Sequence, residues 1–330
     1  VDPSATRRTW LISAAALAAG GVVLPSHAQS AFRPTRPVKI ISPLLPGGAT
    51  DAIIRPIALK LSELWGQPVI VENKAGAGSS IAAEAVSKSA PDGYTVLIAS
   101  PSSISVNPAL NPKLAYGPKD LFPVTKITSS PLVIAANPNA GIGSLLELVA
   151  KAKKSPGTIN YATSGNGSAP HLGAALFAQV TGIEMTHIPF KGGGPAIQSV
   201  VAGDTQLTFG TPPSVLPMIQ AGRLKGLGVS TKEKSVLVPG IPGSIEAGVP
   251  DYAIEFWYGI FVPNGTPPAV VKKIFDAAQF AMSQPNVKTA LAREGTDVDV
   301  SKSPDQFANF LTEDAKFWTK LVKSAGVKLD

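Results

Sequence analysis

Two stretches far apart in this chain show the same order of predicted elements, and this repetition limits the folds that the chain can adopt. The first stretch begins with a strand over 38–45 and a glycine loop at 46–51. Apolar residues then recur at helical spacing, as Ile53, Ile54, Ile57, Leu61 and Leu64. Gly66 ends this helix, a second strand covers 69–71, and a Lys–Gly loop over 73–78 closes the unit.

The second stretch repeats this order, beginning with a strand over 158–162 and a glycine loop at 164–168. Ser168 is the predicted N-cap of the next helix and Pro170 lies in its first turn, positions that these residue types favour. The unit is completed by a helix end at Gly182, a strand over 184–189 and a Lys–Gly loop at 191–194. Two separated βαβ units predict two α/β lobes rather than one sheet.

Two apolar segments, 132–138 and 256–265, each lead into a loop and a helix, and they are the predicted passages between the lobes. Lobe 1 is then 29–130 plus 256–330, and lobe 2 is 131–255. Two passages of this kind form a hinge, with the cleft between the lobes.

The C-terminal helix has a start signal at 303–306, where Ser precedes Pro and Gln occupies the capping-box position. One helical face behind this signal carries Phe307, Phe310, Leu311, Phe317, Trp318 and Leu321. We interpret this face as core that packs on lobe 1.

The N-terminal segment has the features of a secretory signal. Arg7 and Arg8 precede an apolar run over 10–24, and a small-x-Ala pattern ends at Ala28. Residues 1–28 are therefore predicted to be a signal peptide, of the general secretory (Sec) or the twin-arginine type, and the protein to be exported. A retained membrane anchor is the alternative, but the run is short for a span of about 20 residues.

Composition excludes several classes of function. The chain contains no Cys, which excludes a disulfide scaffold, a thiolate zinc site and a Cys nucleophile. With 29 Lys+Arg against 22 Asp+Glu, the excess positive charge is mild, and it lacks the clustering of nucleic-acid binders. We predict no nucleic-acid partner.

The two glycine loops point to an anionic ligand. The first N–H groups of a helix have no intrahelical partner and carry positive potential, and glycine lets a ligand approach the backbone closely. Two such loops would hold a molecule with an acid group, or with one at each end. Neither a phosphate-binding GxxxxGK[ST] motif nor a complete GxGxxG motif is present, so a nucleotide cofactor has little support.

Catalysis has few candidate residues. Beyond the predicted signal peptide the histidines are His171 and His187, and no G-x-S-x-G motif is present. A Ser168–His171 pair leaves a hydrolase open as an alternative, whereas His187 alternates with apolar residues on a strand and reads as a half-buried structural residue. Metal-ligand motifs are absent, so we predict a binding protein without metal or cofactor.

A series of motifs in fixed order resembles one known family. These motifs are Pro46-Gly47-Gly48-Ala49-Thr50-Asp51 with Arg55, the segment 71–78, Pro91-Asp92-Gly93-Tyr94-Thr95, the segment 164–168 with His171, the segment 187–192, Trp257-Tyr258-Gly259 and Pro263-Asn264-Gly265. Together they span essentially the whole chain after residue 28. The sequence is similar to the periplasmic solute-binding receptors of tripartite tricarboxylate transporters.

The resemblance implies a two-lobed periplasmic binding protein of the Venus-flytrap type. It would be a monomer that delivers a small organic carboxylate to membrane permease subunits. The site residues that it implies are Gly47, Gly48, Ala49 and Asp51 in the first wall, Ser100 and Ser102 beside it, Ser164, Gly165, Ser168 and His171 in the second wall, and Gln206 and Phe209. For Asp51, whose charge opposes an anion, we expect a role in bracing the first helix.

Departures from the family pattern bear on the ligand. Ala175 and Gln206 stand where acidic residues are usual, and Ser79 stands where a glycine is common. Because an acid in the cleft would receive an amine or a hydroxyl, Gln206 predicts a mono- or dicarboxylate with an uncharged substituent. A sensory receptor for a signalling partner would share these features, and the residues alone leave it open.

Overall fold

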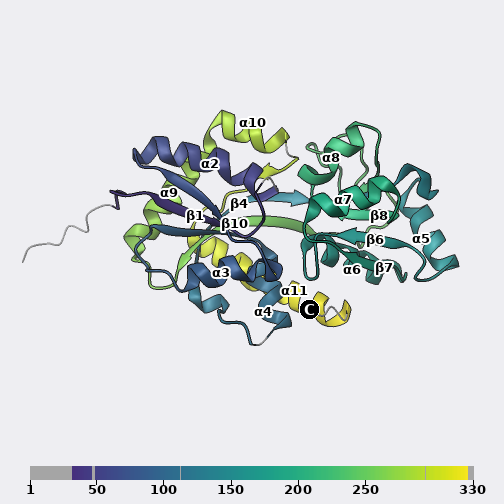
Figure 1. The fold of residues 1–330 in the computed structure, drawn as a ribbon, viewed down its shortest axis with the longest axis horizontal. Helices are drawn as coiled ribbons and strands as arrows, with labels where there is room; N and C mark the ends of the chain where they lie inside the picture. The colour runs from purple at the N-terminus through teal and green to yellow at the C-terminus, as the bar shows by residue number, and fades with distance from the viewer. Residues whose placement is uncertain (1–31, 47–48, 112, 294, 326–330) are drawn as a thin grey trace, which may run out of the picture. The chain divides into compact units, whose positions relative to one another are not determined.

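The computed structural model describes residues 32–46, 49–111, 113–293 and 295–325 (Figure 1). The predicted signal peptide at 1–28, and Gly47 and Gly48 of the first glycine loop, lie outside the described residues. The chain from Arg33 onward forms one compact unit. Among the helices described, none has the length and apolar character that crossing a bilayer requires.

Sheet A contains the first βαβ unit. Its strand order is β11-β4-β10-β3-β1-β2. The strands are β1 (Val38–Ser42), β2 (Val69–Asn73), β3 (Thr95–Ala99), β4 (Leu121–Pro131), β10 (Glu255–Pro263) and β11 (Asp297–Val298). Strand β1 is parallel to β2 and β3, whereas β10 is antiparallel to β3 and β4. The carboxyl ends of the three parallel strands therefore meet at one edge of the sheet.

Helices cover both faces of sheet A. On one face, α2 (Ala49–Trp65) packs with α9 (Pro268–Ser283) and α10 (Pro285–Arg293). On the other face, α3 (Ser80–Ser87) and α11 (Pro304–Ala325) pack on a cluster that contains Leu97, Trp257 and Phe307. The short elements of this half are η1 (Ala77–Ser79), η2 (Ser102–Val106), α4 (Asn107–Leu110) and η3 (Pro118–Asp120).

The predicted start of the C-terminal helix is confirmed. The N–H of Gln306 donates to Ser303 Oγ (3.1 Å), and α11 begins at Pro304. The predicted apolar face is right in part: Phe307 and Trp318 are buried, but Phe310 and Phe317 are 36% and 40% exposed. The helix contacts β4 and η2, and it also reaches α6 of the second sheet.

Sheet B contains the second βαβ unit, in the order β7-β6-β8-β5-β9. The strands are β5 (Val133–Ala136), β6 (Asn160–Thr163), β7 (Thr186–Pro189), β8 (Leu207–Gly210) and β9 (Lys225–Val229). The helices are η4 (Pro138–Ala140), α5 (Leu145–Lys154), α6 (Ala169–Thr181), α7 (Gly193–Ala202) and α8 (Pro212–Gln220). Strand β6 is parallel to β7 and β8, so the carboxyl ends of these strands share an edge. The predicted fold class, an α/β fold with two separate sheets, is thus confirmed.

The chain passes between the two sheets twice, and the passages are tied together. Strand β4 of sheet A ends at Pro131, and a single residue, Leu132, separates it from β5 of sheet B, which begins at Val133. Ser230, which follows β9, donates its N–H to the carbonyl of Leu132 (2.9 Å) and accepts the N–H of Leu132 on its Oγ (2.8 Å). The predicted passages 132–138 and 256–265 are mostly the strands β5 and β10 themselves, and the lobe division at these points stays a prediction.

Candidate functional site

The first wall of the candidate site lies where β1 leads into α2. Asp51, in the first turn of α2, is 4% exposed and accepts from Arg55 Nε (3.0 Å) and Nη2 (2.8 Å) on Oδ2. Its Oδ1 accepts from Nδ2 of Asn73 (2.8 Å), which also donates to the carbonyl of Leu44 (2.9 Å). Asp51 therefore braces the loop and the end of β2, and Arg55 balances its charge.

The loop after β2 follows an unusual backbone path beside this wall. Ala77, Gly78 and Ser79 have φ values of 45°, 60° and 77°, in the left-handed region that favours glycine. Nδ2 of the buried Asn107 donates to the carbonyl of Gly78 (2.7 Å) and to Ser80 Oγ (2.7 Å), which holds this path in place. A strained backbone of this kind persists only where surrounding contacts hold it, and such segments are found most often at active sites and ligand sites.

Ser100 and Ser102 lie where β3 leads into η2, at the same edge of sheet A. Both are nearly buried, at 4% and 6% exposed. The carbonyl of Ser100 accepts from the N–H of Ser103 (3.2 Å) and of Ile104 (3.3 Å), and Ser102 opens a single turn of π-helix. Such turns are rare and occur often at functional sites.

The second wall is the loop between β6 and α6, and its contacts differ from the sequence prediction. Ser168 precedes α6 as expected, but its hydroxyl donates to the carbonyl of Gly165 (2.6 Å) and makes no side-chain cap. The N–H of Gly165 donates to Thr163 Oγ1 (3.2 Å), and the N–H of Gly167 donates to Nδ1 of His171 (3.1 Å). The N–H of Ser168 also donates to the carbonyl of Gly165 (3.2 Å), so three of the loop amides are used within the protein. An anion would meet the remaining donors of the loop and of the first turn of α6.

His171 and His187 form a stacked pair that the sequence reasoning missed. Their ring centroids lie 3.9 Å apart at an interplanar angle of 13°, and His187 also stacks on Tyr161 at 5.1 Å. Nε2 of His187 lies 2.6 Å from Thr163 Oγ1. The pairing of β6 with β7 sets Tyr161 opposite His187, a signal that was readable only once the register was known.

The environment of His171 keeps its ring neutral. Burial, and then the neighbouring His187, lower the pKa of His171 to about 4. Because Nδ1 accepts from the N–H of Gly167, the ring proton lies on Nε2, which is a donor. Within the described residues Ser168 and His171 share no hydrogen bond, so the nucleophile–base pair of a hydrolase is not assembled.

Of two predicted site residues on or beside β8, Gln206 lies away from the loop that precedes α6, and Phe209 has a buried side chain. Gln206 stands before β8, at the amino end of that strand, and its Oε1 accepts from the N–H of Asn160 (2.9 Å). The loop follows the carboxyl end of the parallel β6, at the opposite edge of the sheet. Phe209 is fully buried and packs against Phe177 and Tyr252. The prediction of an uncharged substituent on the ligand, which rested mainly on Gln206, therefore loses its structural basis.

Elements at the carboxyl edge of sheet B contact elements of the first half. Helix α8 starts after β8 and contacts α2, and a Cβ on Gly295 would lie 2.5 Å from Cβ of Pro212. Helix α6, which starts after the second loop, contacts α11. These contacts place the helices that begin at this edge of sheet B next to the helices of sheet A.

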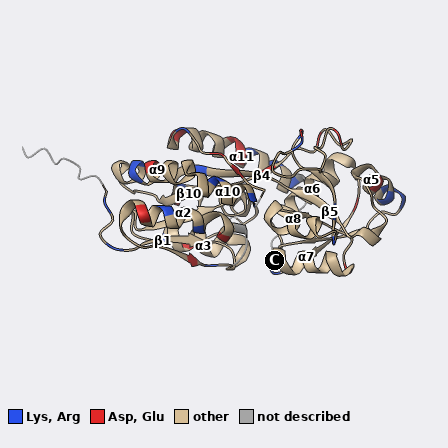
Figure 2. Ribbon diagram, turned by 90° about the horizontal axis from the view of Figure 1, so that it is seen from above, with Lys and Arg blue, Asp and Glu red and all other residues tan. Residues whose placement is uncertain are grey.

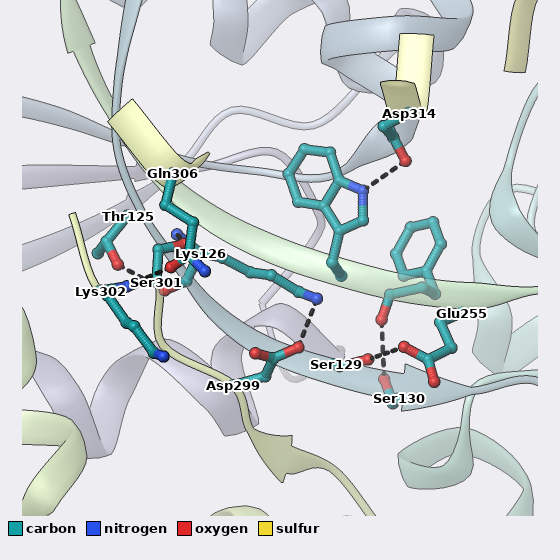
Figure 3. Close-up of polar contacts among 12 residues, drawn as sticks. Thr125, Lys126, Ser129, Ser130, Glu255, Asp299, Ser301, Lys302, Gln306 and Asp314 are labelled. Carbon is teal, nitrogen blue, oxygen red and sulfur yellow. Dashed lines mark hydrogen bonds and ion pairs between the residues drawn. The ribbon is translucent and has the colours of Figure 1, made fainter. Parts of the chain in front are cut away.

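A groove with acidic walls lies beside the two passages. It has a volume of about 400 Å³, and its walls include Asp297, Glu255 and Asp299, of which the last two are labelled in Figure 3. Ser129 Oγ donates to Glu255 Oε2 (2.7 Å), and Lys126 pairs with Asp299. Burial, together with the charges of Asp299 and Glu255, raises the pKa of Asp297. The negative charge makes this groove unsuitable for a carboxylate ligand.

The structure gives little support for a binding site built on a cluster of basic residues, or for a metal site, elsewhere in the described residues. Figure 2 shows Lys and Arg distributed over several elements, among them α5 and α9, rather than gathered along one. No cluster of His, Asp or Glu in the described part of the chain could hold a metal ion. The loops at the carboxyl edges of the two sheets are therefore the candidate site.

The protein has two α/β sheets that are joined by two passages of the chain. Each sheet has, at the carboxyl edge of its parallel strands, a loop that leads into a helix. This arrangement defines a two-lobed periplasmic binding protein. Residues 53–327 match the family described as the tripartite tricarboxylate transporter family receptor. The chain belongs to this family.

Individual relatives agree with this assignment. Protein BugT of Bordetella pertussis is 35% identical over 315 residues, which is 95% of this chain and 96% of BugT. The R. palustris protein Rpa4515, solved with adipate, has a TM-score of 0.85 at 30% identity and covers 90% of this chain and 99% of its own. MatC of Rhodopseudomonas palustris, solved with bound malate, has a TM-score of 0.81 at 31% identity and covers 88% of this chain and 99% of its own.

Proposed function

We propose that this protein captures a small organic carboxylate between the loop that opens α2 and the loop that opens α6, and delivers it to the permease subunits of a tripartite tricarboxylate transporter. One observation carries the proposal: two loops, each at the carboxyl edge of parallel strands, lead directly into the N-terminus of a helix. Such N-termini offer N–H donors and positive potential to an anion. The relatives solved with adipate and malate support the same ligand class.

The charges around the two loops fit an anionic ligand that is bound by neutral donors. Arg55 balances Asp51 in the first wall, so the wall carries no uncompensated negative charge at that position. In the second wall His171 is neutral at pH 7 and offers its Nε2–H. Backbone N–H groups, this imidazole and the hydroxyls of Ser100, Ser102 and Ser164 are the donors for the carboxylate oxygens.

The proposed setting follows from the family and the N-terminal pattern. A receptor that serves a membrane permease works in the periplasm, and the predicted signal peptide at 1–28 is the export signal that this requires. We propose a monomer that binds one ligand, with neither cofactor nor turnover. The protein binds the ligand and releases it unchanged.

Calorimetry with adipate, malate and their uncharged diamides tests the proposal. We expect at least one acid to bind and to raise the melting temperature, and the matching diamide to do neither. The variant Ser102→Ala should weaken binding, whereas Glu233→Gln, in the acidic groove, should leave it unchanged. Equal binding of acid and diamide, or no binding by a panel of mono-, di- and tricarboxylates, would refute the proposal.

A further inference from the structure

Asp314, on α11, is a partly buried carboxylate that lies outside the candidate site. Its Oδ1 accepts two hydrogen bonds, from Nε1 of Trp257 (3.0 Å) and from Nε1 of Trp318 (2.9 Å). Its Oδ2 accepts from Oγ of Ser105 (2.7 Å). Figure 3 labels Asp314 and marks a hydrogen bond to its carboxylate by a dashed line. Burial raises the pKa of Asp314, while these three donors and the charge of Lys126 act in the opposite direction.

The three donors come from three different elements. Trp257 lies on β10 in the centre of sheet A, Trp318 lies one turn further along α11, and Ser105 lies in η2. Both indoles are 1% exposed, so their positions are fixed by core packing. Asp314 therefore links a rigid part of the sheet to η2.

Element η2 needs such links because it is a single π-helical turn at the candidate site. It begins at Ser102, which follows the carboxyl end of β3. Its side-chain ties include the bond from Tyr116 Oη to the carbonyl of Ser103 (2.7 Å), the bond from Ser103 Oγ to the carbonyl of Ser100 (3.3 Å) and the bond from Ser105 to Asp314. Since π-helical turns have poor intrinsic stability, these tertiary contacts decide where the turn lies.

We propose that Asp314 is a positioning residue for ligand binding. Through its hydrogen bond with Ser105 it holds η2 in place, so that Ser102 and the start of η2 are correctly positioned at the carboxylate site. The inference rests on the proposed function. When the tie is lost, η2 occupies several positions, and the apparent affinity falls in proportion to the fraction of molecules that remain competent.

Two single variants separate this role from general stability. Ser105→Ala removes the tie to η2 and leaves both indole bonds. Trp318→Phe removes one donor to the same carboxylate and leaves the tie. Loss of a hydrogen bond to a charged group corresponds to about a tenfold effect on an equilibrium. We expect Ser105→Ala to raise the dissociation constant for the acid by about tenfold. Trp318→Phe should leave the dissociation constant within about twofold of the wild-type value. The comparison is made at a similar decrease in the melting temperature of the two variants.

A conservative variant provides the rescue. In Asp314→Asn the amide oxygen can accept from both indoles, and Nδ2 can donate to the hydroxyl of Ser105. This variant should bind the acid nearly as tightly as the wild type. Asp314→Leu, of similar size without polar atoms, should bind as weakly as Ser105→Ala, and near-UV circular dichroism checks that it is folded.

Hydrogen exchange of the amides over 102–107, measured without ligand, gives a readout that does not depend on binding. Ser105→Ala should speed exchange in this segment, and Trp318→Phe should not. Unchanged exchange and unchanged affinity in Ser105→Ala would overturn the positioning role. A wild-type protein that binds no carboxylate would instead overturn the proposed function, and with it the ligand part of this inference, whatever the exchange shows.

Discussion

Acid should weaken this protein through one buried imidazole, that of His171. The ring stacks on His187, and its Nδ1 accepts the N–H of Gly167 in the second loop. A proton on Nδ1 would break this hydrogen bond and place a charge in a buried position. The native state therefore resists protonation of His171, and lowering the pH should favour unfolding and loosen the loop.

The size of the effect follows from the lowered pKa. His171 binds its proton near pH 4 in the native state, against 6.5 for the ordinary side chain. The unfolded chain thus holds more protons between these values, and the free energy of unfolding falls as the pH falls through this window. The contribution is fully present above about pH 6.5, and about 3 kcal/mol of it should be lost by pH 4.

Urea denaturation at pH 7 and pH 4 measures this loss, with His171→Gln as the matched control. The amide oxygen of Gln can accept the N–H of Gly167 but does not titrate. The stability of the wild type relative to the variant should therefore drop by about 3 kcal/mol between the two pH values. NMR provides a direct check, because the chain has only three His. Titration of His171 near pH 6.5, or a ring proton on Nδ1, would refute the reasoning.

Three further substitutions test the packing around the site. Asp51→Asn, which weakens the ion pair with Arg55, should lower the melting temperature without changing the preference among ligand charges; a large gain in affinity at unchanged melting would contradict the bracing role. Gly173→Ala would place a Cβ 2.2 Å from Cδ1 of Leu132, and should cost about 1–3 kcal/mol in urea denaturation; a neutral result would show that Leu132 can move aside. Phe307→Ala, in the core of sheet A, should cost about 3–5 kcal/mol by the same measurement, and a loss below 1 kcal/mol would mean that the core collapses around the cavity.

Local patterns were sufficient for much of the fold. The helices α2 and α6 end before Gly66 and Gly182, which both have φ of 63°, as the glycine positions predicted. The start of α11 at Pro304 was readable from the residues around Ser303. These signals work because capping and helical periodicity depend on neighbours within a few residues.

Parts of the candidate site could not be read in this way. Gln206 and Phe209 were placed in the site from a motif, but strand direction puts Gln206 at the opposite edge of sheet B, and the side chain of Phe209 is buried in the core. Ser168 was the expected side-chain cap, yet its hydroxyl bonds to Gly165. Which partner a hydroxyl chooses depends on loop geometry, which spacing along the chain does not specify.

The amino-acid sequence by itself determined the two βαβ units, their glycine loops and the order of elements along the chain. The tertiary structure alone decided that β10 lies between β3 and β4, that His171 stacks on His187, and that Asp314 meets Ser105. Ser105 and Asp314 are 209 positions apart in the sequence. Contacts of this kind arise when separated elements pack to bury their apolar faces, and only the packed chain fixes which polar groups are left to pair.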